Sequence, residues 1–163
     1  DTNLIPNVNQ YLNTIKYLKF KWQKEFRFGK FALDNSFIYQ SVNQDNKVLN
    51  LPDFITRNTF YYSNNVFNKA MFLQTGVSFK YFSKFHANEY NPLVSSFHVQ
   101  SEKQIGGFPV IDIFVNAKIQ QTRLYLKAEH INSASTGNNF YSSPSYPYRD
   151  FLVRFGLVWN FFN

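Results

Sequence analysis

Apolar and polar side chains alternate with a period of two along most of the chain, which is the pattern of a β-strand with one apolar and one polar face. The last segment shows it most clearly, because every second residue from Phe151 to Phe161 is large and apolar. Six further segments share the alternation, the one at 53–63 most weakly. The expected strands are 14–28, 31–42, 53–63, 69–82, 110–120, 121–131 and 150–162. The pattern predicts an all-β fold with antiparallel strands, and we interpret residues 1–163 as one β-barrel segment.

Short and long connections alternate between these strands, as they do in outer-membrane barrels. Gly29-Lys30 and Gln120-Gln121 have the length of two-residue hairpin turns, and Gly29 supplies a permissive backbone in the first. A third short turn is expected at 64–68. Longer and more polar connections cover 43–52, 83–109 and 132–148, and an alternating run at 97–100 leaves room for two additional strands.

The two faces of the strands suit a membrane better than water. Ordinary strands are most often about 5–6 residues long and membrane-spanning strands need about 9–11, and the expected strands run over about that length or more. Aromatic residues lie near the strand ends, where membrane interfaces would be. The prediction is an antiparallel transmembrane β-barrel of the outer-membrane type, and a soluble ligand-binding β-barrel is the alternative. The residues expected to face lipid are Phe20, Trp22, Phe37, Leu73, Val77, Ile113, Val115, Leu126, Phe155, Leu157 and Trp159.

Lys24 is an exception, because it falls on the apolar face between Trp22 and Phe26. A lysine that faces lipid at the middle of a bilayer costs roughly 2–4 kcal/mol, and the cost falls toward zero near the interface. Since Gly29 follows closely in the sequence, the ammonium group of Lys24 is expected to reach the headgroup region.

Composition and charge narrow the function classes. Aromatic residues make up 20% of the chain, too much apolar ring surface for a disordered segment. There is no cysteine, so thiolate metal sites, disulfides and cysteine nucleophiles are excluded. The net charge of +7 indicates an anionic partner, which could be nucleic acid, lipid headgroups or small anionic solutes.

Most of the charged residues share the polar phase of the strands and are candidates for lining a barrel interior. They are Lys19, Lys21, Arg27, Arg57, Lys80, Asp112, Lys118, Arg123, Lys127, Glu129 and Arg154, together with the acidic Glu25 and Asp34. An excess of interior bases would favour anions. The competing interpretation is that these charges pair across neighbouring strands and make the wall rigid.

Candidate chemistry beyond this is sparse. His86, His98 and His130 lack the spacing of a metal site, and we interpret them as surface or loop residues. The serines at 133–146 lie in ordinary loop sequence, so we predict no enzyme activity, no metal and no cofactor. Nucleic-acid binding is not expected, because the aromatic rings and the charges fall on opposite faces of each strand.

The C-terminal strand and several internal segments resemble known proteins. Arg154, Gly156, Trp159 and Phe161 form a polar–glycine–aromatic–aromatic pattern that resembles the C-terminal signal read by the barrel-assembly machinery of outer membranes. The chain also resembles the C-terminal part of the putative porin family of Bacteroidota. The segments that carry this second resemblance are LQTGVSFKYF at 73–82, FVNAKI at 114–119, YLKAEH at 125–130 and SPSYPYRD at 143–150.

This resemblance implies a barrel in the outer membrane of a Gram-negative bacterium, in contact with outer-membrane lipid, the barrel-assembly machinery and other outer-membrane proteins. It implies passive diffusion of small solutes, with a non-conducting subunit or scaffold of an outer-membrane complex as the alternative, and the excess of interior bases adds the expectation that these solutes include anions. Bacterial single-chain barrels have even strand numbers, whereas seven strands are visible in this sequence. We therefore expect additional upstream strands and an outer loop at 1–13.

Overall fold

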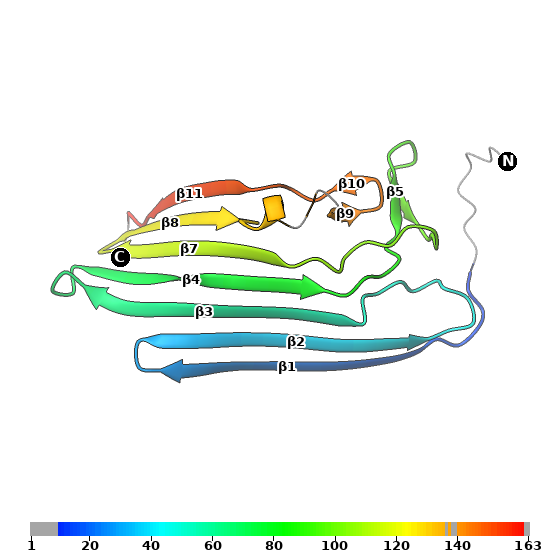
Figure 1. The fold of residues 1–163 in the computed structure, drawn as a ribbon, viewed down its shortest axis with the longest axis horizontal. Coiled ribbons are helices and arrows are strands. Elements are labelled where there is room, and N and C mark those ends of the chain that lie inside the picture. Colours follow the sequence, from blue (N-terminus) through cyan, green and yellow to red (C-terminus); the bar gives the residue numbers. More distant parts are fainter. Residues whose placement is uncertain (1–9, 136, 138–139, 162–163) are drawn as a thin grey trace.

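The computed structural model describes residues 10–135, 137 and 140–161. Seven strands form one antiparallel sheet and lie side by side in chain order (Figure 1). They are β1 (Lys16–Phe28), β2 (Phe31–Asn43), β3 (Phe54–Val66), β4 (Met71–Phe82), β7 (Val110–Ile119), β8 (Thr122–Glu129) and β11 (Leu152–Trp159). Each begins and ends within a few residues of the range that the alternation indicates. The prediction of an all-β antiparallel fold is confirmed.

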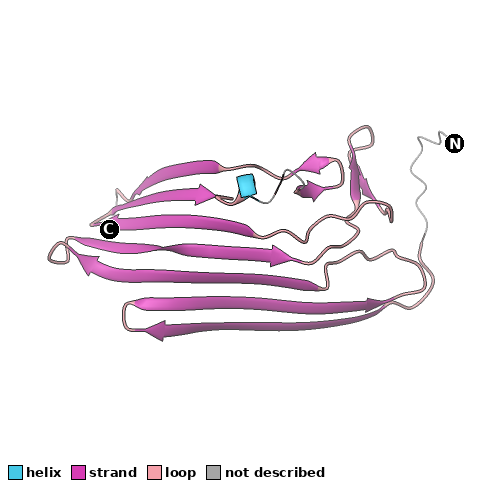
Figure 2. Ribbon diagram, viewed as in Figure 1, coloured by secondary structure: helices cyan, strands magenta, loops and turns pink. Residues whose placement is uncertain are grey.

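The long connections contain most of the remaining regular structure (Figure 2). β5 (Glu89–Asn91) pairs with β6 (Ser96–His98), β9 (Tyr141–Ser143) pairs with β10 (Tyr146–Pro147), and η1 (Ser133–Ser135) is a short 3-10 helix. The two additional strands anticipated within 83–109 therefore exist, but they form a small sheet of their own. No helix in the described part of the chain is long and apolar enough to cross a membrane.

The pairing register divides the main sheet into two faces. Glu25, Asp34, Thr59, Ser78 and Asp112 are successive cross-strand partners from β1 to β7, and we call the face they share the polar face. The opposite, apolar face carries all of the residues expected to meet lipid. The apolar face is not packed into a core, since Phe155 is 83% exposed and Phe20 is 57% exposed.

One polar row interrupts the apolar face. Lys24, Asn35 and Asn58 are cross-strand partners on β1, β2 and β3. Asn58 Nδ2 donates a hydrogen bond to Asn35 Oδ1 at 2.8 Å, and Thr56 Oγ1 donates to Asn58 Oδ1 at 2.8 Å. These bonds partly satisfy the amides inside the row, which lowers the cost of exposing them to an apolar medium. The sequence reasoning identified only Lys24.

Short turns close one end of the sheet, which we call the short-turn end. Gly29 and Gln120 have φ values of 60° and 49°, in the left-handed region that a two-residue hairpin turn requires. The third turn joins Val66 to Met71, which are paired, so the turn expected at 64–68 was wrong and lies farther along the chain. Its residues Phe67, Asn68 and Lys69 also have positive φ.

The opposite end, which we call the long-connection end, holds the buried core. Phe108, Val110 and Phe140 are buried, and Phe82 and Tyr148 pack against them. Glu89 joins the two small sheets there, because its carboxylate accepts a hydrogen bond from Ser145 Oγ at 2.9 Å and lies 3.5 Å from Lys103 Nζ. The core therefore organises the connections, while the long strands form a single layer.

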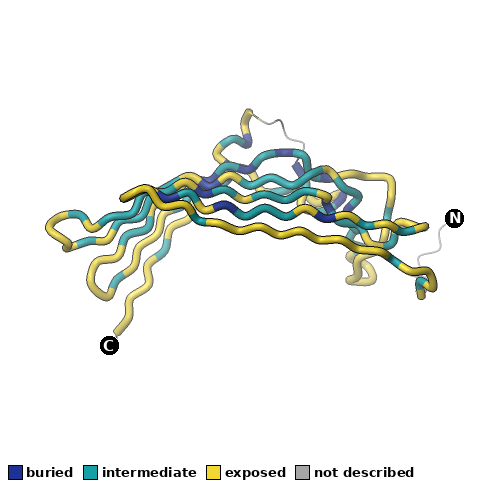
Figure 3. Tube along the Cα trace, turned by 90° about the horizontal axis from the view of Figure 1, so that it is seen from below, coloured by how far each residue is buried: buried dark blue, intermediate teal, exposed yellow. Residues whose placement is uncertain are grey.

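The sheet is open. Among the strands of the described residues, β1 pairs only with β2, and β11 pairs only with β8. Figure 3 views the sheet from the β1 side, where exposed residues run along almost the whole of that strand. The described residues thus form an antiparallel sheet that does not close into a barrel. The loop expected at 1–13 falls mostly outside the described residues.

Candidate functional site: the polar face of the sheet

The polar face carries every charged residue that the sequence identified as a candidate for lining an interior. Alternation within each strand and the register between strands place these residues together. They are Lys19, Lys21 and Arg27 on β1, Arg57 on β3, Lys80 on β4, Asp112 and Lys118 on β7, Arg123, Lys127 and Glu129 on β8, and Arg154 on β11.

A network of ion pairs crosses this face toward the long-connection end. Asp112 is fully buried, and its carboxylate lies 2.5 Å from Lys80 Nζ and 3.0 Å from Lys127 Nζ. Lys127 Nζ also lies 2.8 Å from Glu129, which in turn pairs with Arg154 at 3.2 Å. The network links β4, β7, β8 and β11. Buried charges that are paired in this way hold their strands in one register.

A second, smaller group lies on β1 and β3. Glu25 pairs with Arg27 at 3.0 Å and accepts a hydrogen bond from the Tyr61 hydroxyl. Cross-strand pairing of charges, one of the two interpretations of the sequence, is therefore present at Lys80, Lys127 and Arg154, whereas Arg27 pairs within its own strand. The other five bases, Lys19, Lys21, Arg57, Lys118 and Arg123, form no ion pair with described residues. The polar face thus contains both a paired and an unpaired population of cations.

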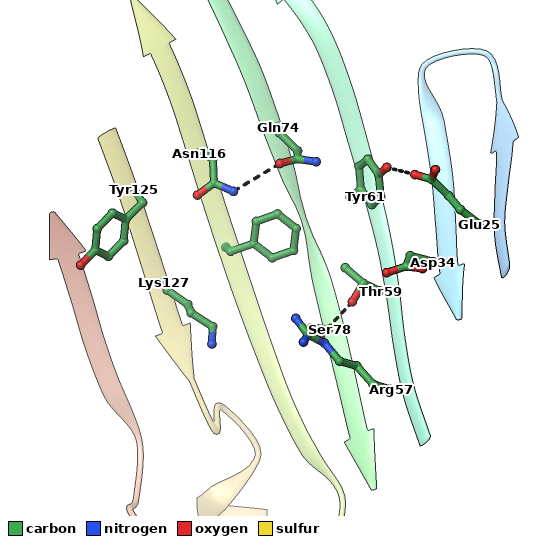
Figure 4. A pocket seen from close by; sticks show the side chains of 11 residues that line it. Glu25, Asp34, Arg57, Thr59, Tyr61, Gln74, Ser78, Asn116, Tyr125 and Lys127 are labelled. Carbon is green, nitrogen blue, oxygen red and sulfur yellow. Dashed lines mark hydrogen bonds between the residues drawn. The ribbon is translucent and has the colours of Figure 1, made fainter. Parts of the chain in front are cut away.

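A pocket of about 520 Å³ opens in the middle of the polar face (Figure 4). Its walls combine acids, bases, amides and phenols: Glu25, Asp34, Arg57, Thr59, Tyr61, Gln74, Ser78, Phe114, Asn116, Tyr125 and Lys127. Thr59 and Ser78 share a hydrogen bond of 3.0 Å, and Asn116 Nδ2 donates to Gln74 Oε1 at 3.4 Å. Such a surface can exchange hydrogen bonds with water and with polar solutes.

The sequence reasoning missed the uncharged members of this pocket. Tyr61, Gln74, Asn116 and Tyr125 lie in phase with the charged residues of their strands. Their phase alone could have identified them, because residues two apart in a strand point to the same face.

The C-terminal strand carries the four residues of the predicted assembly signal. Trp159 and Phe161 have stacked rings 4.8 Å apart, and both are exposed. Gly156 pairs directly with Tyr125, and a Cβ atom at Gly156 would collide with the Tyr125 ring. The tyrosine ring therefore lies over the glycine on the polar face.

The histidines differ in their surroundings. His98 is exposed in β6, as expected, whereas His130 is completely buried. Its ring lies 4.5 Å from Phe140 and 5.7 Å from Tyr148, and its Nδ1 atom is 2.9 Å from the carbonyl oxygen of Arg149. Of the interpretation of His130 as a surface or loop residue, the loop position is confirmed and the surface position was wrong. Two connections that are distant in the sequence fold over it, and no local pattern reveals this.

The described residues contain no group of three or more acidic or histidine side chains that could hold a metal ion. Among these residues, two contacts join an acid and a histidine. Asp112 Oδ1 accepts from the backbone N–H of His130 at 3.0 Å, and the His98 ring lies 3.7 Å from the Glu89 carboxylate.

Comparison with known proteins identifies the family of the chain. A family model described as "Putative porin" matches residues 1–163. The chain belongs to the putative porin family. The match supports a porin-like role in general and does not bear on a source in Bacteroidota. Neither the curated proteins nor the solved structures include a significant match to this chain.

Proposed function

We propose that this putative porin forms part of a barrel in the outer membrane of a Gram-negative bacterium and admits small solutes by passive diffusion. The apolar face would contact lipid and the polar face would line a water-filled interior. The proposed role is transport without catalysis or a cofactor. The principal support is the long, uncovered apolar face, since monomeric soluble proteins rarely expose a contiguous apolar surface of this kind.

The soluble alternative is less consistent with the fold. A soluble barrel would pack Phe155 and Trp159 inside and expose Lys127 and Arg154 to bulk water. Phe155 is instead 83% exposed, and Lys127 pairs with the buried carboxylate of Asp112.

Closure is part of the proposal. An unpaired strand edge in lipid leaves backbone N–H and C=O groups without hydrogen bonds, which costs several kcal/mol per group. The free edges of β1 and β11 would therefore pair with additional strands, as the expectation of upstream strands requires.

We further propose a preference for anions. Nine bases (Lys19, Lys21, Arg27, Arg57, Lys80, Lys118, Arg123, Lys127 and Arg154) share the polar face with four acids (Glu25, Asp34, Asp112 and Glu129). Because the acids cannot neutralise all of the bases, a positive field would remain along the interior and raise the local concentration of anions.

The test is a measurement of single-channel current and reversal potential for the purified full-length protein in a planar bilayer with a salt gradient. A current is expected, and its reversal potential should have the sign that indicates greater permeability to anions than to cations. A cation-selective current would refute the charge argument. The absence of current in correctly inserted protein would favour the scaffold alternative.

The C-terminal strand would carry the signal for the barrel-assembly machinery. Replacing Trp159 and Phe161 with Ala should reduce outer-membrane insertion more than replacing Phe20 and Phe37, although each pair removes two aromatic rings. Insertion is measured as the folded, heat-modifiable fraction in isolated outer membranes. Equal losses for the two pairs would indicate general hydrophobicity instead of a signal.

A further inference from the structure

A second pocket of about 470 Å³ lies near the short-turn end of the polar face, and the described residues that line it include two bases and no acid. The bases are Lys118 on β7 and Arg123 on β8, and they are direct cross-strand partners. Like charges directly opposite each other destabilise an antiparallel pair. An anion bound between the two side chains would attract both of them and so turn their net repulsion into a favourable interaction.

Other side chains in the same pocket complement an anion of a particular kind. Asn116 and Tyr125 offer hydrogen-bond donors from the same two strands. Phe72 and Val158 are apolar residues on the polar face, and they are 42% and 52% exposed. An ion without an apolar part would not pack against these two side chains, whereas an ion with an apolar part would.

We infer that this pocket binds an organic oxyanion, a carboxylate or phosphate group attached to an apolar body. The guanidinium of Arg123 matches the planar, two-oxygen edge of such a group, and the Lys118 ammonium adds a second charge. The apolar body packs against Phe72 and Val158. The inference rests on the proposed function in one respect, that solutes reach the polar face from water, and it narrows the solutes to anions with an apolar part.

Binding is tested by isothermal titration calorimetry of the full-length protein in a non-ionic detergent. The probes are phenyl phosphate and inorganic phosphate, which share the head group and differ in the apolar body. We expect phenyl phosphate to bind about tenfold more tightly, because the ring loses contact with water. Arg123→Gln and Lys118→Gln should each weaken phenyl phosphate binding by about tenfold or more, since each removes a charge-assisted hydrogen bond.

Lys21→Gln is the matched control, because it removes one unpaired base from the same face in the middle of β1, several strands away from the pocket. Its affinity should stay within about twofold of the unchanged protein, the screened effect of a distant charge. All three residues are exposed, so the variants should retain the fold. Equal weakening in all three variants, or none in Arg123→Gln, would overturn the site. Equal affinity for the two probes would overturn the apolar contact.

A lipid head group is the other source of the same chemistry. Repeating the titration in nanodiscs with and without phosphatidylglycerol separates the two sources. Weaker phenyl phosphate binding only in the anionic nanodiscs supports the site with a lipid as its occupant, and unchanged binding supports a soluble anion. Binding without conductance would contradict the proposed function alone, whereas conductance without binding would contradict the site alone.

Discussion

The bases at the two ends of the polar face differ in whether they are paired with acids. Toward the long-connection end, Lys80 and Lys127 share the buried carboxylate of Asp112, and Glu129 extends the network to Arg154. At the short-turn end, Lys118 and Arg123 face each other with no acid among the described residues that line the pocket. Charges of the first kind are part of the structure, because removing one leaves others unpaired. Charges of the second kind contribute nothing favourable to the sheet, which leaves them available to solutes.

The largest difference should appear in stability. Asp112→Asn keeps the shape of the side chain but leaves Lys80 and Lys127 with less compensation, and we expect a loss of about 2–3 kcal/mol in the free energy of unfolding. Urea titration of the protein refolded into lipid vesicles measures it. Arg123→Gln is the control and should change stability by less than about 0.5 kcal/mol. A loss in Asp112→Asn no larger than in the control would show that the two ends do not differ.

The next effect concerns ion selectivity. Two unit charges about 4 Å apart in water interact by about 1 kcal/mol, which corresponds to about a fivefold change in an equilibrium. The double change Lys118→Gln and Arg123→Gln should therefore lower the anion-to-cation permeability ratio by up to about fivefold, as read from reversal potentials. Arg154→Gln should change the ratio less, because Glu129 already offsets that charge. A larger change in Arg154→Gln would mean that the charges that select for anions lie toward the long-connection end instead of at Lys118 and Arg123.

A smaller effect on the free energy of unfolding should be a gain in stability. Arg123→Glu replaces a pair of like charges with an ion pair to Lys118, and cross-strand pairs of opposite charge contribute about 0.2–1 kcal/mol. We expect the variant to be more stable by about 0.5 kcal/mol and to show no affinity for phenyl phosphate. Urea titration and calorimetry on the same preparation measure both quantities. A less stable variant would mean that Lys118 and Arg123 do not repel each other in the folded protein.

The smallest effect lies in the connections. The hydrogen bond from Ser145 holds the pKa of Glu89 below its ordinary value of 4.5, and the positive charge of Lys103 adds to this effect while desolvation opposes it. The contact is therefore present above pH 4.5 and is lost as the pH falls through the lowered pKa. Hydrogen exchange of the β5 and β6 amides should rise in that acid range beyond the intrinsic pH dependence. Glu89→Gln should show the faster exchange already at neutral pH.

The sequence could predict whatever depends on alternation and on tight turns. Because Gly29-Lys30 is a two-residue turn, Trp22 and Phe37 had to share a face, and the register confirms it. The contact between Lys80 and Asp112 was not predictable in this way. Its register depends on how β4 meets β7 across the long connection 83–109, whose length does not fix a pairing.

The burial of His130 was beyond prediction for a related reason. Phe108 precedes β7 and Phe140 follows η1, so the two rings that enclose the histidine come from different connections. Of the polar row on the apolar face, Lys24 was visible because its charge stands out among aromatic residues. Asn35 and Asn58 could be recognised as members of the row only from the pairing register, which places them opposite each other.

The tyrosine ring over Gly156 bears on how the C-terminal strand finds its alignment during folding. A slip of one residue would exchange the faces of β11, but a slip of two would preserve them, so hydrophobic patterning alone cannot reject it. Such a slip would bring Arg154 or Val158 under the Tyr125 ring, where even a Cβ atom on Gly156 has no room. The contact at Gly76 between β3 and β4 is different, because a Cβ atom there would collide with the Phe60 carbonyl oxygen and the Tyr61 Cβ atom. The pair of Tyr125 and Gly156 thus favours one alignment of β8 and β11 over its nearest in-phase competitor.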